Sequence, residues 1–169
     1  MIAMPHRNMT AWTDDGELEV LTFGLGGETF ALEAVLVREI LDLMPETQVP
    51  GADRLAASVI NFRGRIIPLA DLRIAFGMTP QEDTTDSRIV VIELMLDDEP
   101  VLIGLKTDRV NEVATLLRDA AEAPPAIGMR WPRDHIRCLV RQGGDLIVLP
   151  DLPALFTTLI ARGGEPTIH

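Results

Sequence analysis

Residues that bind metals or form disulfides are scarce in this chain of 169 residues, which contains one cysteine and three histidines. A single cysteine excludes an internal disulfide and a zinc site built from several thiolates. The separations between His6, His135 and His169 match no metal-binding motif. We expect His135 to lie in a turn or at a helix end, and Cys138 to be a buried, unreactive thiol. The sequence therefore predicts no metal site and no cofactor.

Basic residues and long apolar runs are also scarce. The chain has 15 Lys and Arg against 26 Asp and Glu, a formal net charge of −11. Duplex nucleic acid and anionic membrane surfaces both attract Lys and Arg, so neither is an expected partner. The most apolar stretch, residues 89–96, falls far short of the ~20 residues that a membrane helix requires. Residues 1–17 lack the apolar run of a secretory signal, so we expect a cytoplasmic protein without membrane insertion.

What the chain does contain is a series of short alternating patterns of the kind that form strands. In residues 17–25, Leu21, Phe23 and Leu25 share one face, and Gly26-Gly27 leads into a second run, which predicts a hairpin. Glycines 143 and 144 interrupt a second predicted hairpin in the same way. The other predicted elements are strand-like runs at 35–43, 62–69, 88–96, 101–105 and 110–117, short helices at 52–58 and 70–76, and a longer helix at 150–161.

Nine or ten short strands with little helix predict a mainly β protein, and small barrels or a sandwich fit their spacing. The polar segment 79–87 lies near the midpoint, so we expect two small β-barrels, one on each side of it. The expected organisation is a flexible arm (1–16), one domain (17–160) with a first barrel (17–82), a second barrel (88–150) and a C-terminal helix (150–161), and a tail (162–169).

No set of residues in the sequence suggests catalysis. The glycines of Gly24-Leu25-Gly26-Gly27 are wrongly spaced for a dinucleotide fingerprint, and a hairpin explains them. Acidic groups such as Asp97-Asp98-Glu99 are best explained as solvated turns. Because no nucleophile, base and orienting group can be assembled, we expect a protein that is not an enzyme. Two other hypotheses stay open: a hydrolase with a site assembled from distant residues, and a ligand-binding barrel lined by methionines such as Met44, Met78, Met95 and Met129.

Three charged segments need more than a packing explanation. Residues 61–73 place two arginines, a glycine and a proline in an otherwise apolar run, and the two-residue period predicts that Arg63 and Arg65 share one strand face. In Val37-Arg38-Glu39-Ile40, Val37 and Glu39 share a face in the same way. The third segment, residues 107–113, is a charged turn that leads into a strand.

Taken in order, these segments resemble the CheW family, the coupling proteins of bacterial chemosensory arrays. The strongest part is Val59-Ile60-Asn61-Phe62-Arg63-Gly64, followed by Ile67-Pro68 and Asp71-Leu72-Arg73. Val37-Arg38-Glu39-Ile40 precedes this run, and Asp108-Arg109-Val110 follows it at familiar spacing. The resemblance covers about residues 17–157.

The resemblance implies a non-catalytic adaptor that folds as two small five-stranded β-barrels, SH3-like or OB-like, packed together with short helices and a C-terminal helix. Such proteins bind the regulatory domain of a CheA-type histidine kinase and the cytoplasmic tip of chemoreceptors, the methyl-accepting chemotaxis proteins. By motif position, Val37, Glu39 and Arg63 would contribute to the receptor groove between the barrels. The residues implied to have structural roles in the motifs are Asn61, Gly64, Pro68, Asp71 and Asp108.

The chain also departs from the family pattern. Ser58 and Cys138 stand where glycine is usual, and Phe62 replaces leucine. These departures leave open which receptor and kinase are the partners, and whether the pathway is flagellar, pilus-based or developmental. Exposed strand edges also allow weak self-association.

Overall fold

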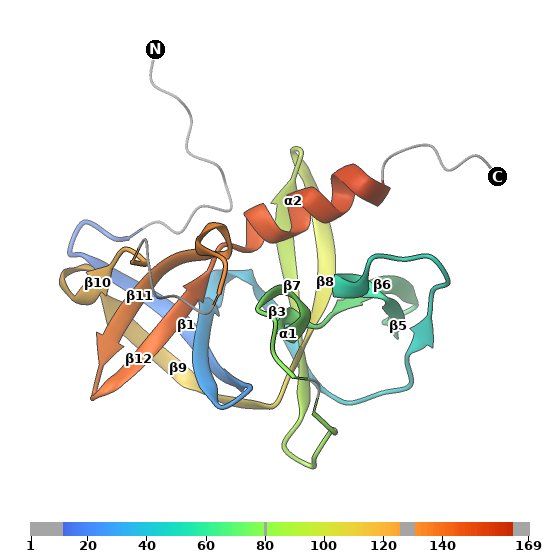
Figure 1. Cartoon of the computed structure of the whole chain (residues 1–169), viewed down its shortest axis with the longest axis horizontal. Coiled ribbons are helices and arrows are strands. Elements are labelled where there is room, and N and C mark those ends of the chain that lie inside the picture. Colours follow the sequence, from blue (N-terminus) through green and yellow to red (C-terminus); the bar gives the residue numbers. More distant parts are fainter. Residues whose placement is uncertain (1–11, 80, 126–130, 164–169) are drawn as a thin grey trace.

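The computed structural model describes residues 12–79, 81–125 and 131–163, which fold into two β lobes (Figure 1). Within these residues there are twelve strands, two α-helices and four short 3-10 helices. The strands are β1 (Glu17–Leu25), β2 (Glu28–Glu33), β3 (Val37–Asp42), β4 (Thr47–Gln48), β5 (Ser58–Phe62), β6 (Arg65–Ala70), β7 (Arg88–Leu96), β8 (Glu99–Thr107), β9 (Arg109–Leu117), β10 (Ala121–Glu122), β11 (Ile136–Gln142) and β12 (Asp145–Pro150). The helices are η1 (Ala34–Leu36), η2 (Arg54–Ala56), α1 (Leu72–Ala75), η3 (Arg118–Ala120), η4 (Arg133–His135) and α2 (Leu152–Gly163).

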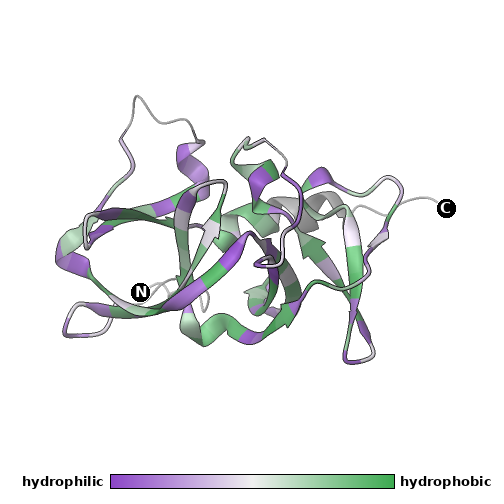
Figure 2. Ribbon diagram, turned by 90° about the horizontal axis from the view of Figure 1, so that it is seen from below, coloured by the Kyte–Doolittle hydropathy of each residue, from purple (hydrophilic) through white to green (hydrophobic). Residues whose placement is uncertain are grey.

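The strands form two six-stranded, curled sheets, one in each lobe (Figures 1 and 2). Sheet 1, in lobe 1, has the order β10-β11-β12-β2-β1-β9, and sheet 2, in lobe 2, has the order β3-β7-β8-β6-β5-β4. Neighbours are antiparallel except for β12 beside β2 and β6 beside β8, which are parallel. Each sheet consists of five longer strands and one strand of two residues. The mainly β fold with two packed barrel-like units is therefore confirmed, with β4 and β10 as additions to the five strands expected.

The expected boundary at the polar segment 79–87 does not separate the two sheets. Sheet 2 uses the continuous stretch from β3 to β8, whereas sheet 1 combines the first two strands with the last four. The chain crosses into sheet 2 through η1 and returns at Asp108, the one residue between β8 and β9. Alternation locates strands along the chain but carries no information about which strands pair, and this is why the polar loop was mistaken for the boundary.

The prediction of one strand over residues 62–69 is wrong, because Arg63-Gly64 is the turn of a hairpin. Phe62 pairs with Arg65 across a two-residue loop in which φ is +52° at Arg63 and +82° at Gly64. Two positive φ values define the hairpin turn that follows the twist of the strands, and glycine adopts the second of them without a steric cost. Arg63 and Arg65 therefore do not share a face of one strand.

A single apolar core joins the two lobes. Phe23 and Phe30 of sheet 1 belong to the same buried cluster as Val90, Ile92 and Leu105 of sheet 2. Helix α2 leaves sheet 1 and packs against β7 of sheet 2, so it bridges the lobes, and its buried residues Leu152, Leu155 and Phe156 complete the cluster. The side chain of Asp151 accepts a hydrogen bond from the Ala154 N–H at 3.0 Å and so caps the start of α2. The helix predicted at 150–161 is therefore present, shifted by two residues.

Each lobe also has its own apolar cluster. In sheet 1 it includes Leu18, Val20 and Leu116, and in sheet 2 it includes Ile60 and Phe62. In the part of the chain that the structure describes, every buried side-chain nitrogen and oxygen has a hydrogen-bond partner. None of the described helices is long and apolar enough to span a membrane.

Candidate functional site

The structure brings together the three residues that the family resemblance assigns to the receptor groove. Val37 and Glu39 lie on β3, and Arg63 lies in the turn between β5 and β6. The Arg63 guanidinium donates a hydrogen bond from Nη2 to Glu39 Oε1. Strand β3 begins the order of sheet 2, whereas β5 lies near its other end, so this ion pair crosses the open seam of the curled sheet.

Glu39 and Arg63 differ in how far they face solvent. Glu39 shares the half-buried face of β3 with Val37 and Leu41, which pack against the core, whereas Arg63 is an exposed residue with 71% of its side chain accessible. The Arg63 guanidinium carbon also lies 5.4 Å from the centre of the Phe62 ring, within range for a cation–π contact. Glu39 and Phe62 therefore hold a guanidinium that remains available to a partner.

The backbone of the turn explains why the neighbouring motif positions are Asn61, Gly64 and Pro68. The Asn61 Oδ1 atom accepts a hydrogen bond from the Gly64 N–H at 2.9 Å, which closes the turn on one side. Pro68 lies in β6, an interior strand, where its missing N–H would normally break a ladder. The parallel pairing of β6 with β8 begins one residue later, at Leu69, so the ladder is intact. These residues shape the hairpin that carries Arg63.

The surface beside this ion pair combines basic and apolar side chains. Arg38 donates to the Val35 carbonyl at 3.2 Å and to Glu93 at 2.9 Å, and it remains exposed. Val35 is 73% exposed and Ile40 is 44% exposed, and they flank Arg38 along the chain. On the hairpin, Arg65 and Ile66 are exposed next to the turn. β3 and the β5–β6 hairpin thus carry three exposed arginines and, with the residues just before β3, three exposed apolar side chains, in a chain with a net charge of −11.

Ser58 occupies the position where the family usually has glycine, and its side chain makes a contact that glycine cannot make. Its buried hydroxyl donates to Glu46 Oε1 at 3.0 Å. The other Glu46 oxygen lies 3.6 Å from Lys106 Nζ, which in turn lies 3.1 Å from Asp83. Ser58 therefore belongs to a polar network that ties two loops of lobe 2 to β8.

The motif residues Asp71 and Asp108 meet through a side chain that the sequence analysis left without a role, Arg73. Arg73 is only 4% exposed, and its guanidinium donates to both Asp71 oxygens, at 3.0 and 3.1 Å. Its Nη1 atom lies 3.4 Å from Asp108 Oδ1. Burial alone would lower the pKa of Arg73, but the hydrogen bond and charge of Asp71 and the charges of Asp108 and Asp83 outweigh it and raise this pKa. The motif Asp71-Leu72-Arg73 was the signal that could have found this ion pair.

Of the histidine and cysteine positions, the structure describes His135 and Cys138, and neither belongs to a group that could hold a metal ion. His135 ends η4 as expected, and its Nδ1 lies 3.0 Å from the Ala75 carbonyl oxygen. Cys138 is half-buried rather than buried, and burial raises the pKa of its thiol. His6 and His169 lie outside the described residues. Within 12–79, 81–125 and 131–163, no group of His, Cys, Asp and Glu could hold a metal ion.

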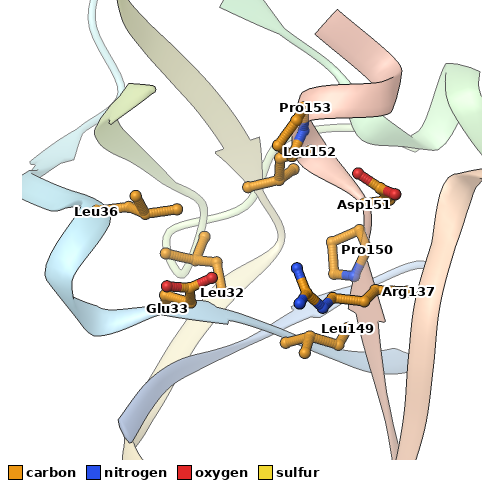
Figure 3. Close-up of a pocket in the computed structure, with 9 residues that line it drawn as sticks. All are labelled: Leu32, Glu33, Leu36, Arg137, Leu149, Pro150, Asp151, Leu152 and Pro153. Atoms are coloured by element: carbon orange, nitrogen blue, oxygen red, sulfur yellow. The ribbon is translucent and has the colours of Figure 1, made fainter. Parts of the chain in front are cut away.

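Two hollows lie at the junction between the lobes rather than inside a barrel. The first, where β2 and η1 approach the start of α2, has a volume of about 10 Å³, and Figure 3 shows Arg137 beside Leu149 and Pro150 with its guanidinium directed toward Leu32 and Glu33. A volume of that size holds about one water molecule. The second, of about 370 Å³, opens beside Phe76 and Trp131. Of the methionines proposed as a barrel lining, Met44 and Met78 pack against core clusters, Met95 is half-buried in β7, and Met129 lies outside the described residues.

Comparisons with known proteins agree with the arrangement of the motifs. Residues 19–159 match the family model of the CheW-like domain. The chain is 29% identical over 159 residues to the chemotaxis protein CheW of Bacillus subtilis, which covers 94% of this chain and 98% of that protein. It is 28% identical over 144 residues to the probable chemotaxis protein CheW of Rhizobium etli, covering 85% and 90%. The crystal structure of the scaffolding protein TtCheW from Thermoanaerobacter tengcongensis superposes with a TM-score of 0.72 at 27% identity, covering 82% of this chain and 92% of that one. With the family model matching most of its length, the chain belongs to the CheW-like domain family of chemotaxis scaffolding proteins.

Proposed function

We propose that this protein is a non-catalytic adaptor that couples chemoreceptors to a CheA-type histidine kinase in the cytoplasm. The observation that carries the proposal is the exposed Arg63 guanidinium, held by Glu39 and Phe62 at the seam of sheet 2. Membership of the CheW-like family supports the adaptor role. The regulatory domain of the kinase is the second partner, and no individual residue is assigned to it.

The geometry suggests how a receptor helix would be recognised. Arg63 presents a planar set of donors that suits a carboxylate, and such charge-assisted bonds are the stronger class of hydrogen bond. Val35, just before β3, and Ile40, on β3, are exposed and offer apolar surface for the apolar stripe of a helix. Val37 packs against the core that joins the two lobes and supports β3. Glu39 would orient Arg63 and repel a partner carboxylate that approaches out of register.

The test is co-sedimentation of the purified protein with receptor signalling fragments and the histidine kinase, with kinase autophosphorylation followed in the same tubes. We expect the wild type to assemble with both partners and to alter kinase activity. Arg63→Glu should weaken receptor binding at least about tenfold, because truncating one partner of an interfacial charged bond costs about 2–5 kcal/mol. Binding to the kinase should remain.

Arg141→Glu is the matched control. Arg141 is also exposed and also pairs with one carboxylate, Glu122 at 2.7 Å, but it lies on sheet 1. It should leave receptor binding unchanged. Wild-type receptor affinity in Arg63→Glu would refute the assigned receptor face. Binding of the folded wild type to the kinase but to no chemoreceptor would favour a scaffold in a pilus-based or developmental pathway, and binding to neither would favour the ligand-binding hypothesis.

A further inference from the structure

The two lobes meet at a point where the chain itself changes sheets. Asp108 is the one residue between β8 of sheet 2 and β9 of sheet 1. Its backbone N–H donates to the Gly24 carbonyl at 2.9 Å, and its Oδ2 atom accepts from the Gly26 N–H at 2.7 Å. Both bonds attach this crossover to the hairpin of β1 and β2, so Asp108 is fixed to lobe 1.

Arg73 approaches the same aspartate from lobe 2. It lies on α1, which follows β6, and Asp71 caps this short helix by accepting from the Arg73 N–H at 3.1 Å. The guanidinium donates to both oxygens of Asp71 and to the Gln81 carbonyl, while Nη1 faces Asp108 Oδ1. We call the three side chains of Asp71, Arg73 and Asp108 the interlobe clamp.

The apolar packing around the clamp is close, but it is less directional than the hydrogen bonds of the clamp. Phe30 of lobe 1 and Phe76, just after α1, are in contact in a tilted arrangement, with ring centres 5.1 Å apart. Met78 lies so near the first hairpin that a Cβ atom at Gly26 would come within 2.5 Å of its sulfur. Apolar burial is roughly proportional to area and has little directional preference, so it constrains the angle between the lobes less sharply than hydrogen bonds to a charged group do.

A buried charged group, by contrast, tolerates few geometries. Arg73 has lost its water, so each of its donors needs a partner at hydrogen-bonding distance. A rotation of lobe 1 against lobe 2 would draw Asp108 away from Nη1, so that Asp108 would lose its charged partner while Arg73 kept its bonds to Asp71 and to the Gln81 carbonyl. An ion pair with one buried member contributes little net stability, but it can favour one arrangement of the groups that carry it over the alternatives. From this geometry we infer that the interlobe clamp sets the relative orientation of the two lobes.

The inference does not depend on any partner, and it can be tested on the isolated full-length chain. Spin labels at Asp145 of sheet 1 and Glu99 of sheet 2, both exposed, report the distance between lobes. Labels at Asp145 and Glu19 report a distance within sheet 1 and serve as the internal control. The background carries Cys138→Ser, so that the labelled positions hold the only thiols.

The chosen variant is Asp108→Asn, because the asparagine oxygen can still accept from the Gly26 N–H while the charge that faces Arg73 is lost. We expect the distribution between lobes to broaden or to gain a second distance, with the distribution within sheet 1 unchanged. Arg73→Lys keeps the charge but not the planar set of donors, and it should have the same effect. Ser58→Ala removes a buried hydrogen bond inside lobe 2 and should change neither distribution.

The outcome that overturns the inference is a folded Asp108→Asn or Arg73→Lys protein whose distance distribution between lobes matches that of the wild type. If one of these variants does not fold, the other decides. Broadening of both distributions together would also overturn it, since it would show general loosening rather than a change in angle. The inference would also be overturned if Ser58→Ala broadened the distance distribution between lobes as much as Asp108→Asn does.

Discussion

Replacing Arg63 by asparagine should separate the stability of the protein from its binding function. Arg63 has a φ of +52°, a conformation that costs a residue with a Cβ atom about 1–2 kcal/mol. Asparagine tolerates this conformation and is favoured at that position of such a turn. The substitution therefore relieves backbone strain while it removes the guanidinium that contacts Glu39 and Phe62.

The relief of backbone strain and the loss of the two contacts nearly cancel in their effect on the free energy of unfolding. An ion pair as exposed as that of Arg63 contributes about 0.2–1 kcal/mol, and an exposed cation–π contact contributes about 0.5–1 kcal/mol. Set against the strain that is relieved, the net change in the free energy of unfolding should lie within about 1 kcal/mol of zero. For a domain of this size, about 1 kcal/mol corresponds to a Tm shift of about 2–4 °C.

Thermal melts and receptor co-sedimentation on the same preparation test this prediction. We expect Arg63→Asn to melt within about 4 °C of the wild type and to bind receptor fragments at least about tenfold more weakly. Arg63→Gly, which also accepts the positive φ, is the control for backbone effects and should behave alike. A loss of stability above about 2 kcal/mol with receptor affinity retained would refute the reasoning, because Arg63 would then be a structural residue.

Three further substitutions and measurements test the packing. Ser58→Gly removes the hydroxyl that donates to Glu46 and should lower the free energy of unfolding in urea by about 1–2 kcal/mol; no change would show that the network is dispensable. Phe76→Ala should lower the free energy of unfolding by about 3–5 kcal/mol in the same assay, because the ring is buried between the lobes. A decrease of less than about 1 kcal/mol would contradict that packing. The Cys138 thiol, whose pKa burial raises, should react with a disulfide reagent more slowly in the folded protein than in urea. Since its folded pKa exceeds its unfolded pKa, stability should fall as the pH rises through the unfolded value, about 8.5, and Cys138→Ser should lack that fall.

The sequence predicted the local elements well, because their signals are local. Gly26-Gly27 and Gly143-Gly144 marked two hairpin turns, and both have positive φ values in the structure. The turn at Arg63-Gly64 was missed because arginine is an unusual residue for its first position, and the surrounding apolar run concealed it. A turn can therefore be predicted from the sequence only where it uses the residues that its backbone conformation favours.

Features that depend on residues far apart were not predictable in the same way. The contact of Arg63 with Glu39 depends on the curl of sheet 2, which no pattern in either segment encodes. The family resemblance named both residues, but not their ion pair. Arg73 was read as part of a motif, and its burial against Asp108 became evident only once the chain was seen to change sheets there. Ser58 was noted only as a departure from a family pattern, and its bond to Glu46 gives that departure a physical reason.

The insertion of lobe 2 between the two parts of lobe 1 has a consequence during synthesis. Strands β3 to β8 leave the ribosome as one block and can pair as soon as they emerge, whereas β1 must wait for β9. Thr22 and Glu112, which bond across that pair, are 90 residues apart. At about 5–20 residues per second, the first hairpin spends roughly 5–18 s with both edges unpaired. Nascent lobe 1 is therefore the part of the molecule most exposed to chaperones and to pairing with other chains, and substitutions in β1 or β2 should change the yield of folded protein more than its equilibrium stability.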